Sequence, residues 1–161
     1  MNNVAISADE FAQRRARASA DLDGATGVIF AGSGGGLEEE FRPHLHFEYL
    51  TGIIDEPGAM LVLDPTATRK THKEILILSP HLPEVERWDG WRGIIDSSLR
   101  SKFGFKTIMR TNHFASTLAQ ICARSKKAMC LHALADHESA VGPDLEVFQK
   151  LQQRIPGLEI L

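Results

Sequence analysis

Two histidines and a glutamate alternate along one short segment, as His44, His46 and Glu48. If this segment is a strand, alternate side chains lie on one face, so all three are expected to point the same way. Imidazole nitrogens and carboxylate oxygens are ligands for zinc and manganese. The pattern therefore makes these residues candidate metal ligands; the alternative interpretation is the polar face of a short surface segment.

Two other motifs that often carry chemistry are incomplete. The glycine-rich loop at 32–36 follows an apolar run, but a dinucleotide-binding Gly-x-Gly-x-x-Gly would need glycine where Leu37 stands. The pair His137 and Glu138 begins a His-Glu-x-x-His zinc motif, yet Val141 occupies the place of the second histidine. The sequence therefore predicts neither a dinucleotide-binding loop nor a zinc-peptidase helix.

The composition excludes several kinds of partner. The chain has 161 residues, 43% of them hydrophobic and 24% charged, which is ordinary for one soluble globular domain. A net charge of −3 gives no general attraction for phosphate backbones, so no nucleic-acid partner is expected. No apolar run approaches the roughly 20 residues that cross a bilayer, and no signal peptide is visible. We expect a cytoplasmic protein with no membrane partner.

Helices and strands are expected to alternate along the chain. Ser7 and Glu10 have the spacing of a capping box, and the helix that they begin is expected to end at Gly24, with Arg15 and its basic neighbours on the solvated face. Asn112 is expected to cap a later helix. Further helices are predicted at 97–103 and from 143 to 155, and strands at 28–31, 59–63, 75–78, 105–109, 128–131 and 158–161, the second and third forming a hairpin.

This order of elements predicts the fold class. Helices that alternate with apolar strands, with one hairpin, are typical of an α/β domain in which helices pack on a mixed sheet. No linker divides the sequence, so residues 1–161 are expected to form a single domain.

Three segments resemble the N-terminal domain of aminopeptidase P. Residues 47–63, Phe-Glu-Tyr-Leu-Thr-Gly-Ile-Ile-Asp-Glu-Pro-Gly-Ala-Met-Leu-Val-Leu, are similar to the family's central segment, and residues 86–92, Glu-Arg-Trp-Asp-Gly-Trp-Arg, to its Glu-x-Trp-x-Gly-x-Arg. The opening helix resembles the family's Phe-x-x-Arg-Arg-x-x-Leu, with Ala18 in place of leucine. Where the family usually has Arg-x-Asp-Ser-Asx-Phe, this chain carries His44 and His46 instead.

Three residues of the central segment are expected to have structural roles. Tyr49 and Leu50 are expected to fill a core. Gly52 is expected to adopt a backbone conformation that most side chains do not allow.

The resemblance implies a fold and an activity. It implies a mixed β-sheet of about six strands with helices packed on it, the ribonuclease H-like domain also found in creatinase and prolidase. In this "pita-bread" metallopeptidase family, a C-terminal domain binds two metal ions, usually manganese, through two aspartates, one histidine and two glutamates. That domain removes an N-terminal residue that precedes proline. The catalytic C-terminal domain is expected to be absent from this chain, which should therefore be inactive alone and hold no cofactor.

The resemblance also implies a role for the N-terminal domain of such an Xaa-Pro aminopeptidase. It is expected to partner its own C-terminal catalytic domain, to shape a cleft for proline-containing peptides, and to build a homo-oligomer, a dimer or a tetramer. Trp88, Trp91 and Arg92 are the candidates for cleft or interface contact, because indoles are enriched at binding interfaces. The alternatives are a free-standing binding or scaffold module, and a small metal-binding protein that uses the histidine and glutamate ligands above.

Overall fold

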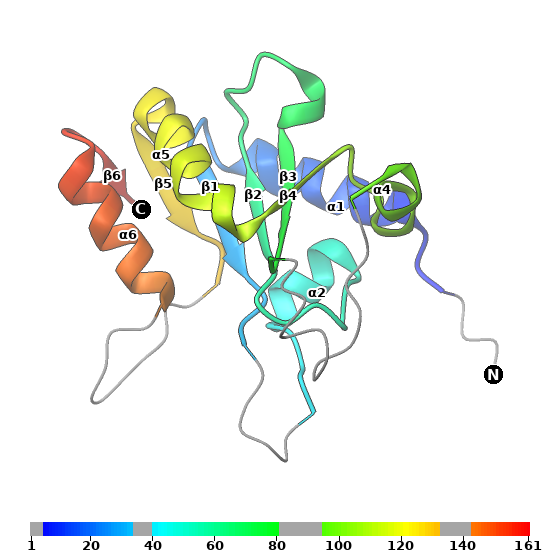
Figure 1. Ribbon diagram of the computed structural model, residues 1–161. Coiled ribbons are helices and arrows are strands. Elements are labelled where there is room, and N and C mark those ends of the chain that lie inside the picture. The colour runs from blue at the N-terminus through cyan, green and yellow to red at the C-terminus, as the bar shows by residue number, and fades with distance from the viewer. Residues whose placement is uncertain (1–4, 34–39, 81–94, 133–142) are drawn as a thin grey trace.

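The computed structural model describes residues 5–33, 40–80, 95–132 and 143–161 (Figure 1). Its helices and strands alternate much as predicted. In chain order they are α1 (Ala8–Asp21), β1 (Thr26–Phe30), α2 (Leu45–Thr51), β2 (Met60–Leu63), the 3₁₀ helix η1 (Lys70–His72), β3 (Glu74–Leu78), α4 (Ser97–Phe103), β4 (Thr107–Arg110), the 3₁₀ helix η2 (Thr111–His113), α5 (Phe114–Ser125), β5 (Lys127–Cys130), α6 (Pro143–Arg154) and β6 (Glu159–Ile160).

The strands form one mixed sheet with the order β4-β3-β2-β1-β5-β6. The predicted hairpin is confirmed, because β2 pairs antiparallel with β3, and Leu61 lies opposite Leu76. β2 also pairs antiparallel with β1, whereas β1 with β5, β5 with β6, and β3 with β4 are parallel pairs. Among the described strands, β2 alone therefore runs against the others, and the remaining five end at the same edge of the sheet.

Helices cover both faces of this sheet, and each face has its own core. Alternate residues of β1 illustrate the division, since Ile29 packs with Phe47 of α2 and Phe103 of α4, while Val28 packs with residues of α5 and α6. Strands buried on both sides need nearly continuous apolar sequences, which is why the runs in β2 and β3 lack alternation. The predicted α/β fold class is confirmed.

Arg15 differs from the sequence prediction. It was expected on a solvated helix face, but only 1% of it is exposed. Its guanidinium donates to Glu74 Oε2 at 2.9 Å, to the Leu50 carbonyl at 3.1 Å and to the Gly104 carbonyl at 3.2 Å. The same group lies 4.1 Å from the ring centroid of Phe105. A buried arginine needs such partners, and all of them are remote in the sequence, so the solvated assignment was wrong.

The two predicted helix caps have different outcomes. The Glu10 amide donates to Ser7 Oγ at 3.2 Å, so the start of α1 is confirmed. α5 begins at Phe114 without a side-chain cap, because η2 leads directly into it. The predicted cap at Asn112 is therefore wrong, since the 3₁₀ turn supplies hydrogen bonds that a capping side chain would otherwise provide.

The turn after α2 confirms one prediction and corrects another. Gly52 ends the helix with φ of 70°, and a Cβ there would lie 2.5 Å from the ring of Phe11. Leu50 is buried as expected, but Tyr49 is 53% exposed, so its predicted place in a core is wrong. Adjacent residues of a helix point in directions about 100° apart, so burial of one does not bury the next.

None of the described helices is both long enough and apolar enough to cross a bilayer.

Candidate binding edge of the sheet

The edge at which five strands end is the candidate functional region, which we call the carboxyl edge. β1, β3 and β5 lead there into segments 34–39, 81–94 and 133–142, which lie outside the described residues. α2 begins at the same edge, since the His44 amide donates to the Ala31 carbonyl at 2.9 Å. In open α/β sheets, ligands bind outside the carboxyl ends of the strands.

Hydrogen bonds fix the backbone where β3 leaves the sheet. Ser79 Oγ donates to the Pro57 carbonyl at 2.7 Å, and Arg110 Nη1 donates to the Ser79 carbonyl at 3.0 Å. Thr111 Oγ1 donates to the Leu78 carbonyl at 2.9 Å. The exit of β3 is thus held from two sides, two residues before the segment 81–94 begins.

Trp88, Trp91 and Arg92, the residues predicted to contact a cleft or interface, belong to that segment. They lie outside the described residues, so their assignment stays a prediction. Their two attachment points are described, at Pro80 after β3 and at Ile95, which packs against the core formed with α2 and α4.

Three histidines from two distant parts of the chain meet at the carboxyl edge. The ring centroid of His44 lies 5.2 Å from that of His46 and 4.6 Å from that of His132. His46 Nδ1 donates to the Leu131 carbonyl at 2.9 Å, which places its proton on Nδ1. These contacts tie the start of α2 to the end of β5. Sequence analysis singled out His44 and His46 but assigned no role to His132, whose position depends on the pairing of β1 with β5.

His44 is the N-cap of α2. Its Nδ1 accepts a hydrogen bond from the His46 amide at 3.3 Å. Burial lowers the pKa of His44 below its ordinary value, and the neighbouring imidazoles of His132 and His46 lower it further. A neutral imidazole keeps the lone pair that the cap requires, whereas protonation of Nδ1 would remove it.

The predicted metal-binding arrangement of His44, His46 and Glu48 is not formed. The segment is the start of a helix and not a strand: His44 is the N-cap of α2, and His46 and Glu48, two residues apart on the helix, point about 200° apart and do not share a face. His46 Nδ1 is also engaged by a backbone carbonyl. In the described ranges, no group of three or more histidine, cysteine, aspartate or glutamate side chains could hold a metal ion.

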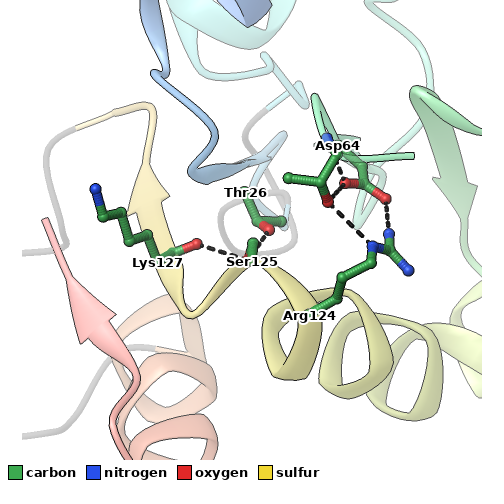
Figure 2. Close-up of polar contacts among 6 residues, drawn as sticks. Thr26, Asp64, Arg124, Ser125 and Lys127 are labelled. Carbon is green, nitrogen blue, oxygen red and sulfur yellow. Dashed lines mark hydrogen bonds and ion pairs between the residues drawn. The ribbon is translucent and has the colours of Figure 1, made fainter. Parts of the chain in front are cut away.

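A second polar cluster lies at the opposite edge, where β1 begins and β2 ends, and sequence analysis missed it. Asp64 is 1% exposed, and its carboxylate accepts from the Thr66 amide at 3.1 Å and from Arg124 Nη2. Figure 2 shows Asp64 facing Arg124, with Thr26 beside Ser125, whose hydroxyl oxygens are 2.8 Å apart. The signal available in the sequence was Asp-Pro-Thr at 64–66, which is typical of a turn closed by an aspartate side chain.

The two cysteines, Cys122 and Cys130, are not disulfide-bonded. Burial raises the pKa of Cys122 to about 11, and burial also raises that of Cys130. Both thiols therefore stay protonated at neutral pH, and a protonated thiol is a poor nucleophile.

The described residues define an α/β domain with helices on both faces of a mixed sheet and a carboxyl edge from which three long segments depart. The family model for the aminopeptidase P N-terminal domain matches residues 11–130, and the chain belongs to this family. The predicted family is therefore confirmed. A search of curated proteins finds no match.

Solved structures agree with this fold. A candidate aminopeptidase P from Bacillus anthracis superposes with a TM-score of 0.78 at 21% identity, covering 97% of this chain and 38% of its own. Aminopeptidase PepP from Pseudomonas aeruginosa gives 0.74 at 21% identity, with 97% and 36% covered. Aminopeptidase P from E. coli, in its low pH form, gives 0.73 at 21% identity, with 97% and 37% covered. The chain thus spans less than two fifths of the length of each of these relatives.

Proposed function

We propose that this domain is the non-catalytic N-terminal part of a cytoplasmic Xaa-Pro aminopeptidase, and that its carboxyl edge forms one wall of the substrate cleft. The observation that carries the proposal is the difference between the share of this chain that the solved structures cover and the share of those structures that this chain covers. The chain is covered over 97% of its length by chains of aminopeptidase P structures, yet it spans only 36–38% of them. A domain of this family is therefore expected to act together with a larger catalytic domain.

The catalytic domain and this domain would have different roles in the reaction. The catalytic domain would supply two metal ions, manganese in this proposal, which provide Lewis-acid activation of the peptide bond before proline. This domain would supply the wall that excludes water and admits only the N-terminus of a short, proline-containing peptide. Positioning of this kind contributes to catalysis without any group that reacts.

The exit of β3 is suited to carry such a wall. Its backbone is held by the hydrogen bonds of Ser79, Arg110 and Thr111, so the segment that follows starts from a rigid point. That segment contains Trp88 and Trp91, whose indoles offer large apolar surface with one donor each. A cleft wall built on rigid elements holds its contacts more accurately than one built on a free loop.

The test is the kinetics of a two-domain enzyme carrying Trp88→Ala. We expect kcat/KM for a peptide with proline in the second position to fall about tenfold, equivalent to about 1.4 kcal/mol of transition-state stabilisation. Trp91→Ala and Arg92→Ala extend the test along the same segment. Gln152→Ala is the matched control, because this exposed side chain lies on α6 outside that segment. Unchanged kinetics and unchanged oligomer mass in all three segment variants would refute the proposal.

A homo-oligomer, dimer or tetramer, is the second part of the proposal. What supports it is a group of exposed large apolar side chains among the described residues, namely Ile6, Leu45, Tyr49 and Ile54.

A further inference from the structure

The connection between β2 and β3 carries an unbalanced positive charge. Residues 65–73 include three cations and no carboxylate, in a chain whose net charge is −3. Arg69, Lys70 and Lys73 are exposed, and within the described ranges none of them takes part in an ion pair. This part of the surface is therefore positive on a molecule that is negative overall.

A hollow of about 460 Å³ lies between this connection and α1. We call it the lysine hollow. α1 contributes the small side chains of Ala16, Ser19 and Ala20 to its wall, and the connection contributes Pro65, Lys70 and Lys73. Binding sites for small groups have volumes of this order and combine apolar wall with a few polar side chains.

The carboxylate in the described wall of the lysine hollow is already engaged. Glu74 Oε2 accepts from the Arg15 guanidinium at 2.9 Å, and Arg15 is 1% exposed. The negative charge of Glu74 is thus balanced from inside the domain, whereas the charges of Lys70 and Lys73 are not. An anion that enters the hollow would meet a net positive wall.

The connection is held in place before any partner binds. The Asp64 carboxylate accepts from Arg124 (Figure 2), and the Asp64 amide donates to the Lys73 carbonyl at 2.8 Å. Thr107 Oγ1 donates to the Thr71 carbonyl, which ties the connection to β4. A site that is ordered in advance loses less conformational entropy on binding.

We propose that the lysine hollow is a docking site for an acidic segment of another protein. Lys70 and Lys73 would bind carboxylates of that segment, and an aliphatic side chain of the segment would cover Ala16 and Ala20. The charge of the wall and its small apolar side chains together specify this kind of partner.

The chemistry of the wall favours a peptide over a nucleic acid. Nucleic-acid binding draws on many contacts between cations and phosphates, whereas the described wall offers two lysines next to a glutamate. Ala16, Ala20 and Pro65 add apolar surface, which an aliphatic side chain can remove from water and a phosphate cannot.

The lysine hollow lies away from the proposed cleft. The connection joins the end of β2 to the start of β3, so it leaves the sheet at the edge opposite the carboxyl edge (Figure 1). A partner bound there would leave the carboxyl edge accessible. The inference therefore goes beyond the cleft role and does not depend on it.

Fluorescence anisotropy of the labelled peptide acetyl-Glu-Glu-Leu-Glu-Glu amide, titrated with the 161-residue chain, tests the inference. We expect saturable binding with a Kd below about 1 mM at low salt, which weakens as the salt concentration rises. Lys70→Gln and Lys73→Gln should each raise the Kd about fivefold, because each removes one unpaired cation. Ala16→Leu narrows the hollow without changing the charge and should act in the same direction.

Lys150→Gln is the matched control, because it removes the same charge from an exposed lysine on α6, outside the hollow. It should leave the Kd unchanged, and circular dichroism should show that all four variants keep the fold. A labelled oligothymidylate is the second probe, and we expect it to bind more weakly than the peptide.

Three results would overturn the inference. The first is the absence of saturable peptide binding, and the second is tighter binding of the oligothymidylate. The third is a Kd that Ala16→Leu leaves unchanged, or that Lys70→Gln and Lys73→Gln raise no more than Lys150→Gln does. None of these results bears on the cleft role, which is tested separately by the kinetics of the Trp88 variant.

Discussion

The polar side chains at the two edges of the sheet differ in burial and in their partners. At the edge where β1 begins, Asp64 is buried and its carboxylate is surrounded by donors, including Arg124 and Thr66. At the carboxyl edge, His44 and His132 are half-buried, His46 is exposed, and the His44 ring contacts the other two. A buried carboxylate surrounded by donors stabilises the fold, whereas the imidazoles of the carboxyl edge are less buried and bond to the backbone through His44 and His46.

The comparison predicts a larger loss of stability at the Asp64 edge. Asp64→Ala removes the acceptor for Thr66 and Arg124 and should lower the free energy of unfolding by about 2 kcal/mol. The loss is limited because the Arg124 side chain is 48% exposed and can be solvated by water. Urea unfolding at neutral pH measures it.

Asp55→Ala is the control for that substitution. The Asp55 side chain is 64% exposed and lies 4.0 Å from Lys102, so its removal should change stability by less than about 0.5 kcal/mol. If Asp64→Ala and Asp55→Ala lowered the free energy of unfolding equally, the buried carboxylate would contribute no more to stability than the exposed one.

A smaller effect is expected where β3 leaves the sheet. Ser79→Ala removes the hydrogen bond to the Pro57 carbonyl and should cost about 1 kcal/mol of unfolding free energy. In the two-domain enzyme it should also lower kcat/KM, because it loosens the anchor of the segment that contains Trp88. Ser116→Ala, which removes an exposed hydrogen bond on α5, is the control. If Ser79→Ala lowered the free energy of unfolding but left kcat/KM unchanged, the Ser79 hydrogen bond would have a structural role alone.

The smallest effect is a pH dependence at His44. Its pKa in the folded chain lies below the ordinary 6.5, so the unfolded chain binds the proton more readily. The stabilisation from neutral His44 is complete above pH 6.5 and is lost as the pH falls through the folded-state pKa.

His44→Asn tests this dependence, because asparagine is a good N-cap and does not titrate in this range. The variant should match the parent chain in urea unfolding at pH 8 and lose less stability at pH 5. His113→Asn, outside the histidine cluster, should leave the pH dependence as it is. A His44→Asn curve that falls as steeply as that of the parent would show that His44 does not contribute.

Local sequence was sufficient for much of the fold. The Ser7 cap and the last helix were predicted because each depends on neighbours within a few residues, and the β2–β3 hairpin because its two apolar runs follow each other closely in the sequence. The family resemblance rested on the contiguous segments 47–63 and 86–92, and the family match confirms it. The metal site considered at His44, His46 and Glu48 required a strand there, and the segment is instead the start of α2, because alternation of polar residues over so short a segment also fits the first turn of a helix.

The sequence by itself therefore determined the order of the elements, the α/β class and the family, because periodicity, caps and motifs are properties of short stretches. Only the tertiary structure decided that Arg15 is buried, that His132 joins His44 and His46, and that Tyr49 belongs to an exposed apolar surface. The physical reason is distance along the chain. The partners of Arg15 are 35 to 89 residues away, and their approach depends on strand pairing that no local pattern encodes.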